Sequence, residues 1–342
     1  MPAGEILVVE GLKKYFVKGG GFLGGPRRVI KAVDGVSFTL RKGETIGLVG
    51  ESGSGKTTTG RLVLRLLEPD AGRILFEGVD ITHLPESKLR PMRPRMQMIY
   101  QDPYWSLNPR KPVGEAIAEP LIVHRLASRS EARERALELL ERVGLTPPED
   151  FYWRIPAQLS GGQRQRVVIA RAMILKPELL VADEPVSMVD VSMRAEILRL
   201  LKDFQREYGL AMIFITHDLS VARLVADRIM VMYLGRIVEA GPAEEVLRDP
   251  RHPYTAALIT AAPSVRRRRR RRYEIRGEIA DPSNIPPGCR FHPRCPRATE
   301  RCSREEPSLA EAGDGRLVAC HNPLPRGWLA KWLEGEGQAP EA

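Results

Sequence analysis

A glycine-rich turn lies between an apolar run and a helix pattern over residues 46–58, and it ends in a lysine followed by threonines. In this G-x-x-x-x-G-K-[ST] pattern, glycines let backbone N–H groups close around a phosphate chain at a helix N-terminus. We expect the Lys56 ammonium to reach the β and γ phosphates of a nucleotide and the Thr57 hydroxyl to bind Mg²⁺. The residues predicted to contact the nucleotide here are Gly50, Glu51, Ser52, Gly53, Ser54, Gly55, Lys56, Thr57 and Thr58.

A pair of carboxylates, Asp183 and Glu184, directly follows four apolar residues, 179–182. A continuous apolar run is typical of a strand buried on both faces of a parallel sheet. Neighbouring strand residues point to opposite sides, so Asp183 can bind Mg²⁺ while Glu184 faces another atom. Beside a γ-phosphate, Glu184 could accept a proton from the attacking water. The alternative for an acidic pair by itself is a solvated strand end.

Two further polar segments could act on the same phosphate chain. His217 follows another apolar run, 212–215, and would face the same crevice as Lys56 and Asp183; the alternative is a surface or helix-capping histidine. Residues 159–163 read LSGGQ and open a helix pattern, and a serine with two glycines at a helix start forms an anion site.

These residues need a parallel sheet to bring them together. Apolar runs that alternate with helix patterns predict a doubly wound α/β sheet whose ligand sits at the carboxyl ends of its strands. Residues 29–40 are predicted to form two short strands split at Asp34-Gly35, and residues 229–240 a hairpin that turns at Gly235. Residues 113 to about 175 are predicted to be a helical insertion, with Ser128 and Glu131 as a capping box.

Composition predicts a soluble protein of two domains. The 342 residues exceed what one core usually spans, and no run approaches the roughly 20 apolar residues of a membrane helix. The N-terminus also lacks a signal-peptide pattern, so we expect a cytosolic protein, free or docked. We predict a nucleotide-binding domain over 1–245 and a proline-rich module over 246–342.

The net charge of +10 is concentrated, because seven positive charges lie in the block 266–272. Such a block can be a solvated linker, or it can be attracted to anionic lipid headgroups. Nucleic-acid binding is a third alternative, but no aromatic residues are interleaved to stack on bases.

Four cysteines all lie after residue 288, which indicates a local metal site rather than a secreted disulfide scaffold. Structural zinc sites favour ligand pairs two to four residues apart, and no such pair of cysteines exists here. Four thiolates on an irregular loop can instead wrap an iron–sulfur cubane. A [4Fe–4S] cluster, zinc and plain thiols all stay open, with His292 and His321 as bystanders. The spacing is Cys289-x₅-Cys295-x₆-Cys302-x₁₇-Cys320.

Together these motifs resemble the nucleotide-binding subunit of an ATP-binding cassette (ABC) transporter, over residues 1 to about 245. LSGGQ is the discriminating motif, because phosphate loops occur in many NTPases. The resemblance implies that Tyr15 stacks on adenine and that Gln101 links Mg²⁺ and the attacking water to the membrane partner. It also implies that His217 contacts the γ-phosphate. Nucleotide on a facing subunit would be bound by Ser160, Gly161, Gly162 and Gln163.

One departure from the family pattern lies at residues 187–190, which read SMVD where the family usually has alanine and leucine between serine and aspartate. The residues found there instead, Met188 and Val189, are also apolar, so we expect an active ATPase.

Further segments resemble the oligopeptide/dipeptide importer branch, specifically its second ATP-binding subunit. They are residues 102–110, 184–187, 251–255 and 288–296. The resemblance implies a [4Fe–4S] cluster in the cysteine module and a seat for the membrane subunit's coupling helix near 101–113. It implies as partners a homologous ATP-binding subunit in a heterodimer, two membrane-spanning permeases and an extracytoplasmic solute-binding protein.

The predicted function is an ATP-hydrolysing motor subunit of an importer for peptides or related oligomeric solutes, peripheral on the cytoplasmic side of the cell membrane. The alternative is a soluble ABC ATPase that acts on nucleic acid or ribosomes. It is disfavoured because such factors commonly carry two cassettes or a coiled-coil insertion, and neither is present. A regulatory cassette with a dead site is also disfavoured, because no catalytic position is missing. The sequence does not identify the solute.

Overall fold

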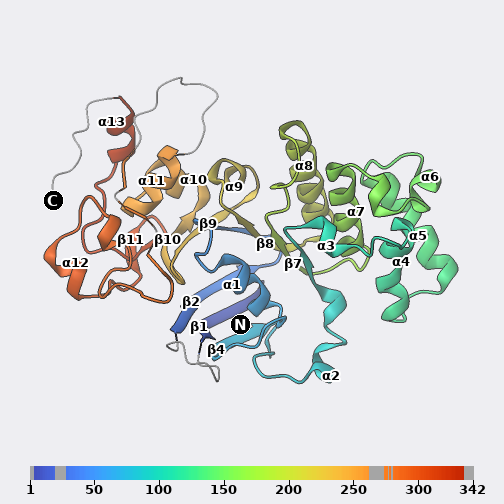
Figure 1. Ribbon diagram of the computed structural model, residues 1–342, viewed down its shortest axis with the longest axis horizontal. Coiled ribbons are helices and arrows are strands. Elements are labelled where there is room, and N and C mark those ends of the chain that lie inside the picture. Colours follow the sequence, from blue (N-terminus) through green and yellow to red (C-terminus); the bar gives the residue numbers. More distant parts are fainter. Residues whose placement is uncertain (1–3, 20–27, 262–272, 276, 279, 335–342) are drawn as a thin grey trace. The chain divides into compact units, whose positions relative to one another are not determined.

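The computed structural model describes residues 4–19, 28–261, 273–275, 277–278 and 280–334 (Figure 1). The arginine block 266–272 and residues 20–27 lie outside them. The chain divides into two compact units. Unit 1 comprises residues 1–7, 40–44 and 76–214, and unit 2 comprises residues 8–39, 45–75 and 215–342.

Unit 1 contains the strand that precedes the carboxylate pair. Strands β6 (Met96–Ile99) and β7 (Leu179–Asp183) run parallel, with Ile99 opposite Ala182, and β8 (Ala211–Thr216) lies on the other side of β7. Every residue of β7 and β8 is buried. This confirms the prediction of strands buried on both faces, which their continuous apolar sequences favour.

The helical insertion of unit 1 is confirmed. Ser128 caps the start of helix α5: its hydroxyl accepts from the Glu131 N–H, while the Glu131 carboxylate accepts from the Ser128 N–H. Figure 1 shows α4 to α7 gathered in green. The longer helices of unit 1 are α4 (Val113–Val123), α5 (Arg129–Arg142), α6 (Pro148–Tyr152), α7 (Gly161–Met173) and α8 (Val191–Tyr208). Its short elements are β5 (Val79–Asp80), α2 (Glu86–Leu89), η1 (Arg93–Arg95), α3 (Pro103–Ser106) and η2 (Pro156–Gln158).

Unit 2 holds the strand that leads into the phosphate loop. Strand β3 (Thr45–Val49) runs parallel to β9 (Arg228–Tyr233), which forms the predicted hairpin with β10 (Arg236–Pro242). The C-terminal residues extend this sheet, because β12 (Arg316–Val318) pairs with β10 and β11 (Ala310–Gly313) pairs with β12. The division at residue 245 stays a prediction, but the residues beyond it share a sheet with the hairpin.

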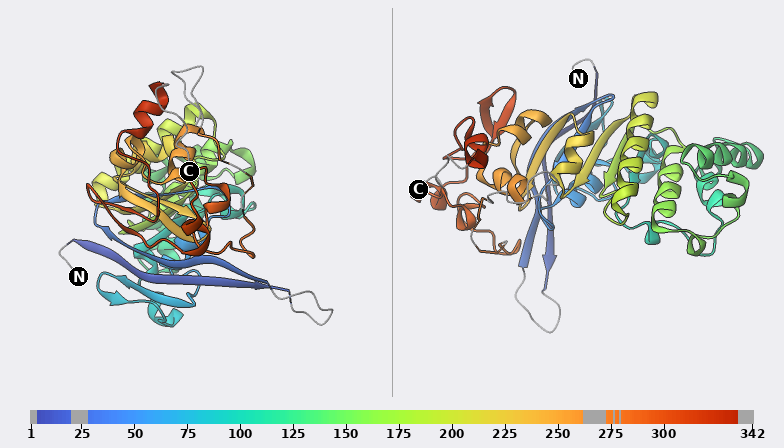
Figure 2. Two further views of the ribbon diagram at one scale, coloured as in Figure 1. Left: turned by 90° about the vertical axis from the view of Figure 1, so that its left-hand side faces the viewer. Right: turned by 90° about the horizontal axis from the view of Figure 1, so that it is seen from above.

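A second sheet of unit 2 has β1 (Glu5–Lys18) between β2 (Arg28–Arg41) and β4 (Ala71–Phe76). Figure 2 shows β1 and β2 in blue as a long ribbon of two strands. The predicted split at Asp34-Gly35 is wrong, because β2 runs through both residues. The Asp34 N–H donates to the Gly235 carbonyl at 2.9 Å, and Gly35 takes the irregular backbone with φ of 82°.

Unit 2 has two buried cores. The first includes Val49, Tyr233, Tyr254 and Phe291, all nearly inaccessible to solvent, and receives residues of α9, α10 and α11. The second contains Trp328 and Trp332 of α13. Within the described residues, no helix is both long and apolar enough to cross a membrane. The helices of unit 2 are α1 (Lys56–Val63), α9 (Leu219–Val225), α10 (Ala243–Arg248), α11 (Pro253–Ala261), η3 (His292–Arg294), α12 (Glu300–Arg304) and α13 (Trp328–Glu334).

Candidate active site

The phosphate-loop residues connect β3 to α1 in unit 2. Gly55, with φ of 108°, directly precedes α1, and a Cβ on it would lie 2.1 Å from the Ala32 carbonyl oxygen. Only glycine fits that approach of the loop to β2. The N-cap residue Gly55 provides no side-chain cap for α1. The positive end of the helix dipole therefore lies at the loop, where a phosphate would be favoured.

Lys56 lies across this loop. Its side chain is buried, and Nζ donates to the carbonyls of Gly50 and Glu51, each at 2.8 Å. The ammonium is thereby fixed at the centre of the loop, where phosphate oxygens would need a positive charge. Thr57, the predicted Mg²⁺ ligand, follows in the first turn of α1 and is half-buried.

The carboxylate pair lies in unit 1. Asp183 ends β7 and is 2% exposed, whereas Glu184 is half-buried and has φ of 46°. A left-handed conformation is unusual for a non-glycine residue, costs about 1–3 kcal/mol and is concentrated at functional sites. The Glu184 carbonyl accepts from the N–H and hydroxyl of Ser187 at 3.1 and 3.0 Å, which holds the turn.

Gln101 is brought to the same place, since its side-chain amide donates to the Glu184 carboxylate at 3.5 Å. The two residues follow the neighbouring strands β6 and β7, whose carboxyl ends meet at one edge of the sheet. Two of the three residues predicted to be catalytic, Gln101 and Glu184, therefore lie together in unit 1. Lys56, Thr57 and His217 belong to unit 2, where His217 is exposed at the end of β8.

The LSGGQ segment forms the N-terminus of α7. The Ser160 hydroxyl accepts from the Gln163 N–H at 3.3 Å, and the Ser160 N–H donates to the Gln163 side chain at 3.0 Å, a second capping box. Gly162 is buried, and a Cβ there would lie 2.8 Å from the end of the Met193 side chain. Ser160 itself is exposed, so one serine both caps the helix and faces outward.

Tyr15, the predicted adenine contact, is half-buried in unit 2. Its hydroxyl donates to the Asp34 carboxylate. Burial and this hydrogen bond together raise the pKa of Tyr15 to about 12, so the phenol stays protonated. Asp34 is also paired with Arg290, which keeps the pKa of this carboxyl below its usual value despite burial. The ring of Tyr15 is thus fixed through its hydroxyl.

The four cysteines are free thiols, and Cys302 is the most buried of them. Burial, together with the charges of neighbouring cysteines, raises the pKa of Cys295 and Cys320 to about 12. These two thiols are therefore close enough to other cysteines to interact with them electrostatically. Among the residues that the structure describes, however, no group of three or more His, Cys, Asp or Glu is placed to hold a metal ion.

Two residues from the importer-like segments contact Glu51 of the phosphate loop, and a third contacts Asp34, the hydrogen-bond partner of Tyr15. The Arg294 guanidinium binds both Glu51 carboxylate oxygens, at 2.7 and 3.1 Å. The Glu51 N–H donates to the Tyr254 hydroxyl at 2.8 Å, and Arg290 binds Asp34. No local pattern predicts these contacts, because Glu51 and Arg294 are 243 positions apart.

Comparisons with known proteins agree with this geometry. A family model described as "ABC transporter" matches residues 33–187, and one described as "Oligopeptide/dipeptide transporter, C-terminal region" matches residues 238–302. The Oligopeptide transport ATP-binding protein AppF of Bacillus subtilis is 49% identical over 92% of this chain and 97% of its own length. The Dipeptide transport ATP-binding protein DppF of Escherichia coli is 48% identical over 90% of this chain and 92% of its own length.

A solved structure shows the same fold. It is described as the dimeric structure of a post-hydrolysis state of the ATP-binding cassette MJ0796 bound to ADP and Pi. The likeness has a TM-score of 0.62 and 30% identity, and covers 70% of this chain and 99% of that one. The expected α/β P-loop NTPase fold is confirmed.

Proposed function

Because this chain belongs to the ABC transporter family, among the ATP-binding subunits of its oligopeptide and dipeptide branch, we propose that it hydrolyses ATP to drive import of peptides or related oligomeric solutes. One observation carries the proposal: a phosphate loop with a buried lysine and a peptide-transporter C-terminal region occur in a single chain. The alternative of a nucleic-acid-associated ATPase has no such support.

In the proposed mechanism, each predicted site residue has one role. Lys56 and the first turn of α1 bind the phosphates, His217 contacts the γ-phosphate, and Tyr15 stacks on adenine. Glu184 accepts a proton from the attacking water, which Gln101 helps to orient through its hydrogen bond. Thr57, Gln101 and Asp183 would hold Mg²⁺, which neutralises charge on the phosphates; their oxygen donors suit this ion.

We further propose that a second, homologous ATP-binding subunit completes the site. Ser160, Gly161, Gly162 and Gln163 would face nucleotide on the partner. The first-turn N–H groups of α7 and the exposed Ser160 favour an anion there. The solved MJ0796 cassette is a dimer bound to ADP and Pi, which is consistent with this arrangement.

A groove of unit 1 suits a coupling helix of the membrane partner. It encloses about 700 Å³ and combines the 61% exposed ring of Tyr104 with the charged Lys111 and Glu119. Seven of its ten lining residues belong to the segment predicted for docking, near 101–113, and the other three come from α4 and α7. We propose that two permease subunits bind the ATP-binding pair here, on the cytoplasmic face of the membrane, and that an extracytoplasmic protein delivers the solute. The groove is lined by Asp102, Tyr104, Ser106, Leu107, Asn108, Pro109, Lys111, Ala116, Glu119 and Arg171.

For the cysteines, we propose that Cys289, Cys295, Cys302 and Cys320 hold a [4Fe–4S] cluster, with zinc as the alternative. Support comes from the proximity of the cysteines, because the charges of other cysteines help to raise the pKa of both Cys295 and Cys320. Four cysteine thiolates are the usual ligands of such a cluster. The cluster would fix this loop on the sheet.

The decisive experiment reconstitutes the complex with its permeases in lipid and measures ATP hydrolysis with di- and oligopeptides, against oligosaccharides. We expect peptide stimulation. Glu184→Gln should lower turnover at least 100-fold while ATP binding persists. Hydrolysis at the wild-type rate in that variant, or stimulation by sugars alone, would contradict the proposal.

A further inference from the structure

Glu51 of the phosphate loop is held at three of its groups. Its carboxylate is bound by both terminal nitrogens of Arg294, its N–H donates to the Tyr254 hydroxyl, and its carbonyl accepts from Lys56. A residue fixed at its side chain, N–H and carbonyl has little freedom to move. Because Lys56 is bonded to the same residue, the position of Glu51 also sets the position of the lysine.

Both groups that hold Glu51 are rigidly supported. Tyr254 in α11 is fully buried, with ring centroids 4.7 Å from Tyr233 and 5.4 Å from Phe291. Arg294, at the end of η3, is 6% exposed. A forked, nearly desolvated ion pair is stronger and more directional than a surface pair.

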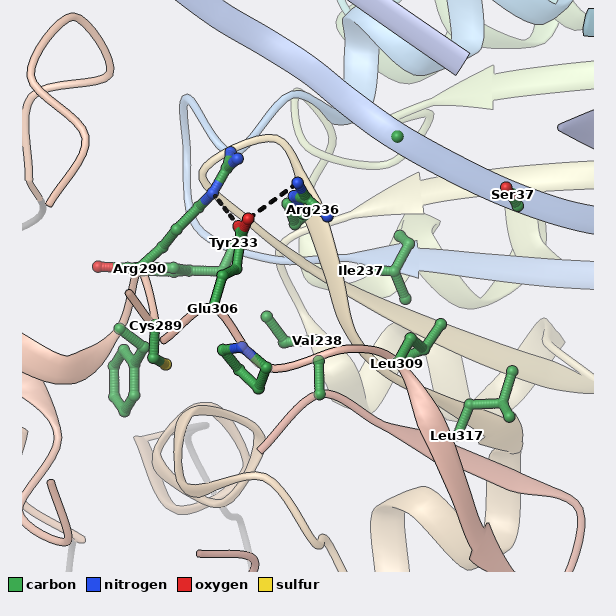
Figure 3. A pocket seen from close by; sticks show the side chains of 14 residues that line it. Ser37, Tyr233, Arg236, Ile237, Val238, Cys289, Arg290, Glu306, Leu309 and Leu317 are labelled. Carbon is green, nitrogen blue, oxygen red and sulfur yellow. Dashed lines mark hydrogen bonds and ion pairs between the residues drawn. The ribbon is translucent and has the colours of Figure 1, made fainter. Parts of the chain in front are cut away.

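A second arm starts from the same loop. Arg290 is 6% exposed and donates to the Asp34 carboxylate and to the Leu234 carbonyl. Asp34 in turn accepts the hydroxyl hydrogen bond of Tyr15. Figure 3 shows Arg290 beside a pocket of about 330 Å³, where Glu306 bridges it to Arg236. The hydrogen bonds of Arg290 thus go to other residues of the chain, which is typical of a side chain that positions its neighbours.

The two arginines belong to one short segment. Arg290 directly follows Cys289, and Arg294 directly precedes Cys295. Both cysteines pack against the core that includes Val49, the last residue of β3. A displacement of Cys289 and Cys295 would therefore move both arginines.

We propose that the segment 289–295 positions the nucleotide site of this subunit, with Arg294 setting the phosphate loop through Glu51 and Arg290 setting the adenine side through Asp34 and Tyr15. This inference rests on the proposed ATPase function and adds two positioning residues to it. It also makes nucleotide affinity a property of the cysteine module. Replacement of Cys289 or Cys295, the two ends of this segment, would then weaken nucleotide binding, although neither cysteine is among the residues proposed to contact the nucleotide.

The test uses the full-length chain and measures the dissociation constants of Mg-ATP and of inorganic tripolyphosphate, both by competition against a fluorescent ATP analogue. Arg294→Gln should weaken both roughly tenfold, because a charge-assisted contact of the phosphate loop is lost. Arg290→Gln should weaken ATP but leave tripolyphosphate unchanged, because only the adenine side is disturbed. The matched control is Arg301→Ala, since Arg301 is 64% exposed and pairs only with Glu305 among the contacts described.

A double-mutant cycle makes the test independent of a general loss of stability. Glu51→Gln should match the effect of Arg294→Gln, and the double variant should bind no more weakly than the weaker single variant. Arg294→Lys, which keeps the charge but not the fork, should be intermediate. If Arg294→Gln does not fold, Glu51→Gln and Arg294→Lys carry the comparison.

Additive losses in the cycle, or wild-type affinity in Glu51→Gln and Arg294→Gln, would overturn the inference. Failure of the proposed function is seen in a different assay, as the absence of peptide-stimulated ATP hydrolysis by the reconstituted complex, whereas this inference is judged on the nucleotide affinity of the single chain.

Discussion

Gln101 and Glu184 are joined by a hydrogen bond of 3.5 Å from the glutamine amide to the carboxylate. Gln101 follows β6 and Glu184 follows β7, two neighbouring parallel strands whose last paired residues are Ile99 and Ala182. Glu184 adopts a left-handed backbone conformation in which its carbonyl is held by Ser187. The fold therefore tolerates conformational strain at the residue that points its carboxylate at this amide.

Gln101→Ala should lower kcat roughly 10- to 100-fold with a smaller effect on the dissociation constant of ATP, because the amide orients the attacking water while Thr57 and Asp183 still hold Mg²⁺. Steady-state kinetics and equilibrium binding measure the two quantities. Gln97→Ala is the matched control, since Gln97 lies on β6, the strand that precedes Gln101, but its side-chain amide donates to the Arg93 carbonyl. An equal effect of both variants on kcat would contradict the role of Gln101.

Gly55→Ala should destabilise the protein by more than about 2 kcal/mol, because a methyl group would lie 2.1 Å from the Ala32 carbonyl oxygen in a left-handed conformation. Gly53→Ala has the same type of backbone, with φ of 79°, but open space, so it should cost only about 1–2 kcal/mol. Urea unfolding compares the two. Equal losses would show that the approach to β2 is not what selects glycine at Gly55.

Ser160→Ala and Ser128→Ala each remove the serine of a capping box, so each should lower the free energy of unfolding by about 1 kcal/mol. Only Ser160→Ala should also impair ATP-dependent association of the Glu184→Gln protein with its partner subunit. Size-exclusion chromatography with ATP reports this. Loss of association in both variants would indicate a stability effect rather than a contact with the partner's nucleotide.

Burial raises the pKa of Glu239 to about 7, although two backbone N–H groups, of Arg251 and His252, donate to it. The folded state then binds a proton that the unfolded state releases near pH 4.5, so stability falls as pH rises from about 4.5 to about 7. Glu239→Gln should remove this pH dependence, which amounts to a change of roughly 3 kcal/mol in the free energy of unfolding. Thr255 and Arg316 also face this carboxylate.

Urea unfolding of the wild-type protein and of Glu239→Gln at several pH values measures the difference between their free energies of unfolding. His252 has the opposite slope, because burial lowers its pKa to about 3 and stability then rises with pH toward its unfolded value. Since burial is the cause, this contribution is shared by both proteins and cancels in the difference. A stability difference that stays constant from pH 4.5 to 8 would contradict the protonation of Glu239.

Protein purified without oxygen should contain iron and acid-labile sulfide in equal amounts, and Cys295→Ser should lose both together with ATP affinity. The physical reason is that Cys295 anchors the segment that carries Arg290 and Arg294. Metal analysis and nucleotide titration measure the two effects. Stoichiometric zinc in place of iron would select the alternative metal.

Sequence alone determined the features whose signals are local. The phosphate loop, the buried apolar run before Asp183, the capping box at Ser128 and the helix start at Ser160 each lie within a few residues, where backbone preference and hydrogen bonding are set by neighbours. The family resemblance rests on the same short segments, and it predicted the fold and the function.

Only the tertiary structure decided how distant segments complete these local units. Strand β2 continues through Asp34 because the Gly235 carbonyl, far along the chain, accepts its N–H. Likewise, Arg294 holds Glu51 across 243 positions. An arginine in a proline-rich stretch has the same sequence signature whether it is solvated or buried. Its partner is fixed only when burial removes water and leaves one carboxylate within reach, and this is a property of packing that no local pattern contains.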